Sequence, residues 1–364
     1  MKRKILMLAI AGALTVASLT GCSSFKAEDV VATVGDKEIT AEVANFYARY
    51  VQAQYETYYS AYLGEDMWNS EASEGKSYEE SVKTSVLENL EDMILLEKHM
   101  DEYEVTLSDE EKKMIEDAAK EFGEANALED KEKVSGSDKA VKRVMTLMVI
   151  QQKMQDAIQA GADTEVSDEE AAQKGMQYVS FLYSNTDEDG KTVDMTDEEK
   201  EETKKKAEKF AKGAKDAKDF EAYAKEQELE AKKATFDSET TSPSEDLIKA
   251  ADKLKEGEVT GVIETDAGCY VAKVTTMLDR EATDARKDTI VSERKQELYT
   301  DTCKKWREDG DISVHDDVWE KISFKDVKVT MKEEVSDPYA NEVQTDDVAE
   351  AKEEAQGGGD TEEK

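Results

Sequence analysis

The sequence predicts an α+β protein in which long helices flank a smaller region of short strands. Apolar residues recur every three or four positions through residues 28–165, which is the spacing of one face of a helix. Between residues 166 and 280, β-prone runs alternate with polar turns and short helices. Only two prolines occur in 364 residues, which favours long helices.

The start of the chain predicts export. Basic residues at positions 2–4 precede an uncharged, mostly apolar run, Ile5–Leu19. At 15 residues this run is shorter than the about 20 that span a bilayer as a helix, and it fits the apolar part of a signal peptide. Leu-Thr-Gly-Cys at residues 19–22 is a lipobox pattern, in which a diacylglycerol is attached to the Cys22 thiol before cleavage. The alternative is a generic signal peptide in which Cys22 falls by chance.

We therefore expect residues 1–21 to be a lipoprotein signal peptide and residues 22–27 a linker. Two acyl chains on Cys22 would hold the protein stably on the extracytoplasmic face of a bacterial membrane. Residues 331–364 are acidic, contain three consecutive glycines and show no apolar periodicity, so we expect a disordered tail.

Composition excludes several classes of function. A formal net charge of −38 opposes binding to nucleic acid. The two histidines, His99 and His315, form no pair with metal-ligand spacing, so we expect neither a metal nor a cofactor nor a catalytic triad. Cys269 and Cys303 either form a disulfide or remain separate buried residues, and the second expectation is the simpler.

Residues 28–165 predict a hairpin followed by helices. The hairpin is Val30–Val34, a Gly-Asp turn and Lys37–Ile39, after which Thr40 begins a helix. Paired Ser and Glu residues three positions apart predict two further helix starts, at residues 78 and 109, and a fourth helix follows at 138–160. Six tyrosines lie between residues 47 and 62, and they serve either core packing or a groove for unfolded chains.

Residues 166–280 predict the element order β-α-α-β-α-β-β. The sequence ranges are strand 177–183, helices 197–217 and 219–226, strand 234–236, helix 243–254 and a closing hairpin, 259–264 and 269–275. Thr196 with Glu199, and Ser242 with Glu245, are the expected capping boxes of the first and last of these helices. Asp266-Ala267-Gly268 supplies the turn of the hairpin.

The hairpin resembles the end of a parvulin-type peptidyl-prolyl isomerase domain. The chain keeps the family's spacing of small, acidic, basic and β-branched residues at Leu254, Gly257, Glu258, Val262, Thr265, Gly268, Lys273 and Val274. The stretch VVATVGDKEIT, residues 30–40, is similar to the start of the SurA and PrsA foldases. This resemblance implies a discontinuous helical chaperone domain, 28–165 with 281–330, into which a parvulin-like domain, 166–280, is inserted.

The resemblance also implies where a site would lie. Parvulins use two facing histidines and an apolar pocket that holds the proline ring. Ser180 and Tyr270 occupy the histidine positions here, and they are the candidate catalytic residues. Phe181, Phe236 and Leu247 are the candidate peptide-binding residues. Asp252 stands where a second pocket phenylalanine is usual.

Two functions from different classes are consistent with these features. The first is a membrane-anchored chaperone that binds newly exported, unfolded polypeptides, with a parvulin-like domain that lacks the usual histidines. The alternative is an active, divergent peptidyl-prolyl cis-trans isomerase acting on exported proteins, so whether the chain is an enzyme stays open. A solute-binding lipoprotein is disfavoured because the sequence lacks repeated βαβ patterns. A homodimer is left open.

Overall fold

A computed structural model describes residues 14–18, 25–64, 66–73, 75–186 and 191–332. Cys22 and the predicted tail beyond residue 332 lie outside the described residues. The described chain forms two compact units. The helical unit comprises residues up to Gly161 and residues from Leu298 onward, and the inserted unit is Ala162–Glu297. A single helix, α10 (Arg280–Asp309), runs through the boundary between Glu297 and Leu298.

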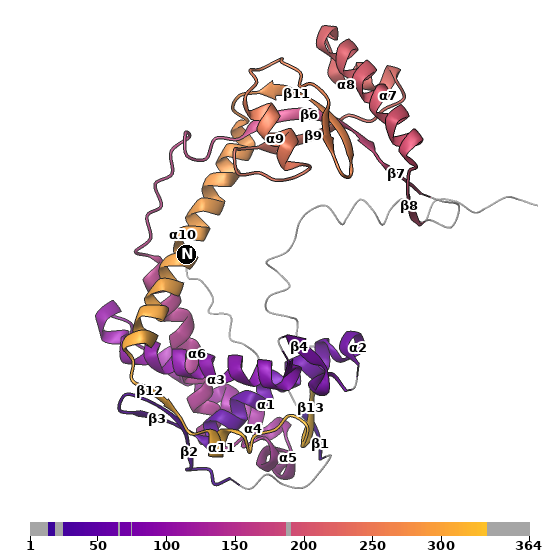
Figure 1. Ribbon diagram of the computed structural model, residues 1–364. Helices are drawn as coiled ribbons and strands as arrows, with labels where there is room; N and C mark the ends of the chain where they lie inside the picture. Colours follow the sequence, from indigo (N-terminus) through magenta and orange to yellow (C-terminus); the bar gives the residue numbers. More distant parts are fainter. Residues whose placement is uncertain (1–13, 19–24, 65, 74, 187–190, 333–364) are drawn as a thin grey trace, which may run out of the picture. The chain divides into compact units, whose positions relative to one another are not determined.

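The helical unit is built mainly from helices, with three small groups of strands (Figure 1). Its helices are α1 (Ala41–Tyr58), α2 (Ser60–Leu63), α3 (Tyr78–Lys98), α4 (Asp109–Ala125), α5 (Leu128–Lys133), α6 (Asp138–Gln159) and α11 (Asp316–Trp319), with short 3-10 turns at Met67–Asn69 and Met100–Tyr103. Its strands are β1 (Leu14–Ser18), β2 (Val30–Val34), β3 (Lys37–Thr40), β4 (Glu71–Ser73), β5 (Lys76–Ser77), β12 (Ile312–Val314) and β13 (Val327–Met331). The predicted hairpin is β2–β3, to which β12 adds a third strand.

The helix starts agree with the predicted capping chemistry. The Ser77 hydroxyl accepts from the backbone N–H of Glu80 while the Glu80 carboxylate accepts from the backbone N–H of Ser77, and Ser108 with Glu111 does the same. Both predicted capping boxes of this unit are therefore confirmed. Thr40 is the residue before α1, as predicted, but its side chain accepts no cap hydrogen bond.

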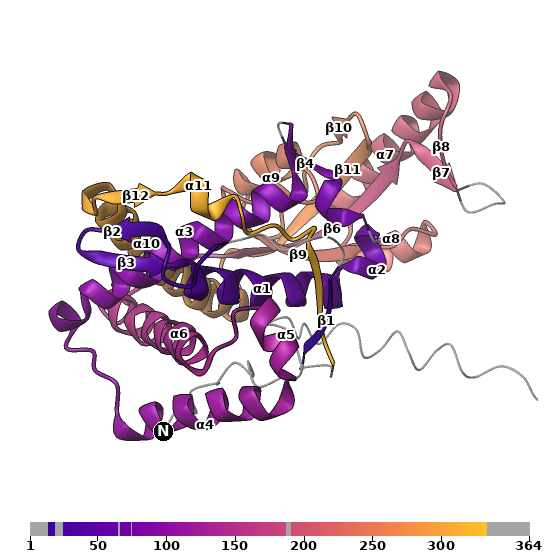
Figure 2. The same ribbon diagram turned by 90° about the horizontal axis from the view of Figure 1, so that it is seen from below.

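The C-terminal segment completes the core of the helical unit. Trp306, Trp319, Phe324 and Val329 are at most 9% exposed and belong to the same apolar cluster as the inner faces of α1, α3 and α6. The prediction that N- and C-terminal segments together build one helical domain is confirmed. Figure 2 shows α11, β12 and β13, in yellow, lying along the indigo and purple elements from the start of the chain.

Polar side chains on α1 fasten this returning segment. Arg49 donates to the carbonyl of Ser323 at 2.8 Å, and Gln52 donates to the carbonyls of Phe324 and Val327 at 3.0 and 2.6 Å. Burial lowers the pKa of Arg49 to about 10, against opposing attraction from nearby carboxylates. The guanidinium therefore stays charged at neutral pH, and the row of bonds is available to hold the segment.

The strand β1 falls within the predicted apolar leader, Ile5–Leu19. It pairs antiparallel with β13, with Leu14 opposite Met331 and Ser18 opposite Val327. Leu14 is 6% exposed in the helical unit's core. Among the described residues, no helix has both the length and the apolar composition needed to cross a membrane.

The inserted unit is an antiparallel sheet covered by helices. Its strands are β6 (Lys174–Leu182), β9 (Lys232–Phe236), β10 (Ile263–Thr265) and β11 (Gly268–Thr276), in the spatial order β10-β11-β6-β9. Its helices are α7 (Asp197–Asp216), α8 (Phe220–Glu226), α9 (Glu245–Asp252) and the first part of α10. This is the predicted order β-α-α-β-α-β-β, with one extra hairpin, β7 (Ser184–Thr186) and β8 (Thr192–Asp194).

Three local predictions need correction. The helix α9 begins at Glu245 with Ser244 as its cap, so Pro243 lies outside it and the predicted Ser242–Glu245 box is wrong. The side chain of Ser244 accepts from the N–H of Leu247, which fixes the start two residues later. The stretch 259–264 is a strand only from Ile263, and Val259 contributes a single bridge to Lys273. Ser167 and Glu170, another Ser and Glu three positions apart, predict a helix start by the same rule, but residues 168–170 form a turn.

Two further sequence features have clear places. Cys269 and Cys303 are both free thiols, with Cys269 in the inserted unit and Cys303 in the helical unit. The six tyrosines between residues 47 and 62 differ in exposure: Tyr47 and Tyr50 are buried, whereas Tyr62 is 88% exposed. Core packing therefore accounts for the first part of α1, and the later tyrosines reach the surface.

Candidate functional site

The sheet of the inserted unit has two differently covered faces. Successive residues of a strand point to opposite faces, so β6 sends Val179 and Phe181 one way and Tyr178 and Ser180 the other. The first face packs on α7 and α8, and the second packs on α9 (Figure 1). The expected site residues can therefore be sorted by face.

Ser180 and Tyr270 lie directly opposite each other. They are register partners in the β6–β11 ladder, on the α9 face of the sheet. The chain thus brings together the two residues that the sequence placed at the histidine positions. Directly opposed residues of an antiparallel pair have Cβ atoms about 4.5–5.5 Å apart, so the two side chains leave the same face of the sheet side by side.

Tyr270 is largely buried, with 7% of its surface exposed. Burial, followed by the neighbouring Tyr178, raises the pKa of its phenol. The phenol is therefore protonated at neutral pH and acts as a hydrogen-bond donor or acceptor rather than as a base. Ser180 adds a second hydroxyl, and residues 166–280 contain no histidine.

Phe236 and Leu247 share the α9 face with Tyr270. Both are fully buried, at 0% exposure, in a cluster with Met176, Ile248 and Val274. Phe236 on β9 and Leu247 on α9 form an apolar floor between the sheet and the helix, and neither has surface free for a ligand in this arrangement.

Phe181 lies on the opposite face, away from the other four candidates. It packs against Phe210 of α7, with ring centroids 5.8 Å apart. Successive side chains of a strand point to opposite faces, so Phe181, which directly follows Ser180, faces the other way. The structure therefore brings together Ser180, Tyr270, Phe236 and Leu247 and separates Phe181 from them.

An ion pair fixes the end of α9 over this face. The ammonium of Lys174 donates to the Asp252 carboxylate at 2.8 Å and to the Asp252 carbonyl at 2.7 Å. Cations are favourable at a helix C-terminus, where carbonyl groups are unpaired. Asp252, which replaces an expected aromatic residue, thus serves to hold the helix rather than to line a pocket.

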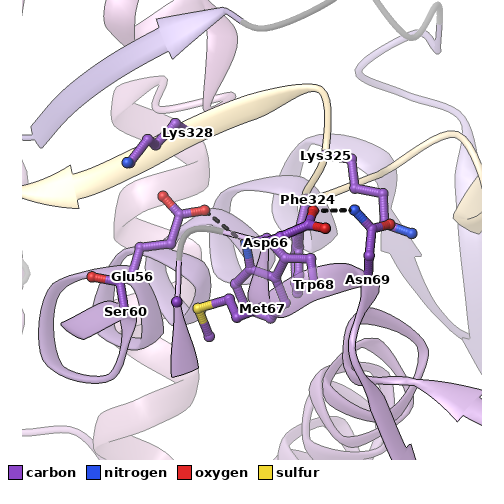
Figure 3. Close-up of a pocket in the computed structure, with 10 residues that line it drawn as sticks. Glu56, Ser60, Asp66, Met67, Trp68, Asn69, Phe324, Lys325 and Lys328 are labelled. Atoms are coloured by element: carbon purple, nitrogen blue, oxygen red, sulfur yellow. Dashed lines mark hydrogen bonds between the residues drawn. The ribbon is translucent and has the colours of Figure 1, made fainter. Parts of the chain in front are cut away.

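The helical unit contains a second candidate site, which sequence reasoning missed. A cavity of about 190 Å³ is lined by Glu56 and Ser60 at the end of α1, by the turn around Trp68, and by the returning segment at Phe324, Lys325 and Lys328 (Figure 3). Its aromatic wall is tight, since the ring centroids of Trp68 and Phe324 are 4.7 Å apart.

Glu56 organises this pocket. Its carboxylate accepts from Trp68 Nε1 at 2.8 Å, from Gln52 Nε2 at 2.7 Å and from the backbone N–H of Val329 at 2.8 Å. Figure 3 shows the indole bound to this carboxylate, with Lys328 across the opening. Small-molecule pockets usually exceed about 300 Å³, so this one suits a single side chain better than a compact ligand. A tryptophan within an otherwise polar stretch was the available sequence signal.

Among the residues that the structure describes, no group of three or more His, Cys, Asp and Glu side chains is arranged to hold a metal ion. The chemistry at hand is that of hydroxyl groups, apolar side chains and peptide-like hydrogen bonds.

Two family models match separate parts of the chain. A family model described as a SurA-like N-terminal domain matches residues 1–132, and one described as a PPIC-type PPIase domain matches residues 182–287. No curated protein sequence matches the chain.

Several solved structures are similar to the chain. The foldase protein PrsA from Streptococcus pneumoniae is 21% identical, with 71% of this chain and 99% of that one covered and a TM-score of 0.29. The foldase protein PrsA from Lactococcus lactis is 16% identical, with 81% and 99% covered and a TM-score of 0.34. A match to SurA-like chaperones of Campylobacter jejuni is 14% identical, covers 79% and 99%, and has a TM-score of 0.28.

Proposed function

We propose that this chain, which combines a SurA-like N-terminal domain with a PPIC-type PPIase domain, is an extracytoplasmic foldase that works mainly as a chaperone. It binds newly exported, unfolded polypeptides and limits their aggregation. The observation that carries the proposal is the pairing of Ser180 with Tyr270 at the centre of the α9 face. Scaffold and topology are those expected for the domain, while two neutral hydroxyl groups stand where the resemblance places histidines.

The apolar floor favours the chaperone role. Prolyl isomerisation requires a pocket that holds the proline ring and favours the twisted amide over the planar one. Phe236 on the sheet and Leu247 on α9 are both fully buried and offer no such pocket without movement. The pocket at Trp68, by contrast, presents aromatic and hydrogen-bonding groups of the kind that accept a side chain from an extended polypeptide.

A divergent prolyl isomerase is the second candidate. Ser180 and Tyr270 are directly opposed, and a protonated phenol is a good donor to an amide carbonyl or nitrogen. If α9, which carries Leu247, moved away from the sheet, Phe236 would face the same space as these hydroxyl groups.

One refolding experiment separates the two candidates. The client is an unfolded protein whose slow refolding phase is limited by prolyl isomerisation, which takes tens of seconds at 25 °C without a catalyst. We expect the chain from Ser23 onward, at about one molecule per client, to suppress light scattering and to leave the rate of the slow phase unchanged within about twofold. Scattering and the slow phase are recorded in the same sample.

Each outcome has a clear reading. Undiminished scattering at equimolar chain would refute the chaperone role. An accelerated slow phase that Tyr270→Phe abolishes would establish the isomerase instead, because this substitution removes only the hydroxyl group. The matched control is Tyr62→Phe, which removes the hydroxyl of an exposed tyrosine in the other unit.

We further propose that the chain is anchored to the membrane by lipid on Cys22. Supporting this are the apolar run Ile5–Leu19 and the Leu-Thr-Gly-Cys ending. The acidic body, which anionic headgroups repel, would stand away from the membrane surface. Cys22→Ser, expressed in a bacterium with a lipoprotein pathway, is expected to move most of the protein out of the Triton X-114 detergent phase. The neighbouring Ser23→Ala is the control and should stay in that phase. Equal partition of both variants would refute lipidation.

A further inference from the structure

The strand β1 occupies a slot in the helical unit that a processed chain would leave empty. It belongs to the segment that we propose is removed on export, so the vacancy of the slot in the mature protein rests on the proposed function. In the part of the chain that the structure describes, β1 is the only strand that pairs with β13. Both views place the two strands side by side (Figure 1 and Figure 2).

On one side of β13 the backbone N–H groups bond to side chains of α1, and on the other side, among the described residues, they bond only to β1. The N–H of Val329 donates to the Glu56 carboxylate at 2.8 Å, and the N–H of Met331 donates to the Thr57 hydroxyl at 3.0 Å. Backbone groups alternate in direction along a strand, so the N–H groups of Lys328 and Thr330 point toward β1. Without β1, these two residues present an open strand edge.

The slot, meaning the site beside β13 that β1 fills, takes apolar side chains on its inner side and leaves the outward side chains exposed. Leu14 is 6% exposed and Val16 is partly buried against the core, whereas Thr15 and Ala17 are exposed. The backbone N–H of Leu14 donates to the Asn126 side-chain oxygen at 2.7 Å, and Asn126 itself is 6% exposed. Without β1 the Asn126 oxygen would lose this donor and the Leu14 site would be unfilled, and a replacement strand could supply both contacts again.

We infer that the exposed edge of β13 binds an extended segment of a client polypeptide by strand addition. The ligand is defined by what β1 shows: a backbone ladder to Lys328 and Thr330, two alternating apolar side chains directed inward, and no demand on the intervening positions. Many unfolded polypeptides can meet this requirement, because it involves only the backbone and two alternate apolar side chains. Few folded proteins can meet it, because their backbone groups are already paired. Before cleavage, the leader's own strand β1 would occupy this edge as an intramolecular ligand.

The test uses a fluorescein-labelled peptide with the sequence of residues 12–20 and the chain from Ser23 to Lys364. We expect saturable, one-to-one binding by fluorescence anisotropy. A chain that begins at Gly12 and carries Cys22→Ser should bind the same peptide at least about tenfold more weakly, because its own tethered β1 competes for the slot at a high effective concentration.

Backbone methylation gives a matched control. The N–H groups of Thr15 and Ala17 face β13, since their partners are Thr330 and Lys328, whereas the N–H of Val16 faces away. An N-methyl group on Thr15 should weaken binding at least about tenfold, and one on Val16 should change it by no more than about twofold. Asn126→Ala in the protein should also weaken binding of the parent peptide, through loss of the bond to Leu14.

Several results would overturn the inference. These are no binding by the chain from Ser23, equal effects of the two N-methyl groups, or binding that appears only when residues 333–364 are deleted or a dimer is dissociated. Binding that appears only after deletion of residues 333–364, or only after a dimer is dissociated, would mean that another part of the chain or a second copy occupies the edge of β13. Failure of the chaperone proposal would look different, since suppression of scattering without peptide binding refutes the slot alone, and peptide binding without suppression refutes the chaperone alone.

Discussion

Glu56→Ala is expected to lower the free energy of unfolding of the helical unit by about 3–5 kcal/mol, because it leaves several buried donors unsatisfied. The carboxylate is 6% exposed and accepts hydrogen bonds from Trp68, Gln52 and Val329. Its removal leaves three buried donors without an acceptor, and each such group costs about 1–3 kcal/mol. The pocket of Figure 3 and the attachment of β13 should be lost together.

The tryptophans make this measurement specific. All three, Trp68, Trp306 and Trp319, lie in the helical unit, so urea unfolding monitored by indole fluorescence reports on that unit alone. Glu88→Ala on α3 removes an exposed carboxylate and should cost less than about 0.5 kcal/mol. Glu56→Gln keeps one acceptor oxygen and should fall between the two. A cost for Glu56→Ala no greater than that for Glu88→Ala would show that the network does not hold the segment.

Gly268→Ala is expected to destabilise the inserted unit by about 3 kcal/mol or more, because backbone strain and a steric clash add. Gly268 has φ of +150°, and a Cβ there would lie 2.3 Å from the carbonyl oxygen of Phe181 and 2.8 Å from Cα of Leu182. Both obstructing atoms belong to the backbone of β6, so no side chain can move aside. The β6–β11 ladder, and with it the pairing of Ser180 and Tyr270, should open.

Gly261→Ala is the matched control in the same segment. A Cβ at this position meets nothing within 4 Å, so its cost should stay within about 0.5 kcal/mol. The inserted unit contains no tryptophan, so far-ultraviolet circular dichroism should show an earlier transition for Gly268→Ala while the fluorescence transition stays in place. Equal transitions for the two glycine variants would contradict the close approach of β11 and β6.

Capping and periodicity were sufficient to predict most helices. Ser77, Ser108 and Thr196 each begin a helix with a glutamate three residues later, and all three boxes form. The signal is local, because one side chain satisfies a backbone donor a few residues away. It failed at α9, where Ser242 and Ser244 are both plausible caps and the side chain of Ser244 makes the cap hydrogen bond.

The arrangement of the site was only partly accessible from the sequence. Strand alternation was enough to separate Phe181 from Ser180, but assigning Phe181 to the site ignored that period. The direct opposition of Ser180 and Tyr270 depends on register, which is set by tertiary pairing. The pocket at Trp68 could not be predicted, because two of its walls, Glu56 and Phe324, are 268 positions apart in the sequence.

The bonds between α1 and the returning segment also impose an order on folding. Gln52 binds carbonyl groups 272 and 275 residues later in the chain, so the helical unit closes only when nearly all of the chain is present. The inserted unit, Ala162–Glu297, is continuous and can finish earlier. Because synthesis proceeds from the N-terminus, the inserted unit can fold before the helical unit is complete, and until then α1 lacks its partners in the returning segment. The entropy cost of closing a loop grows only with the logarithm of its length, so a separation of 272 residues does not by itself make the closing bonds weak. The late completion of the helical unit therefore follows from the order in which the segments emerge.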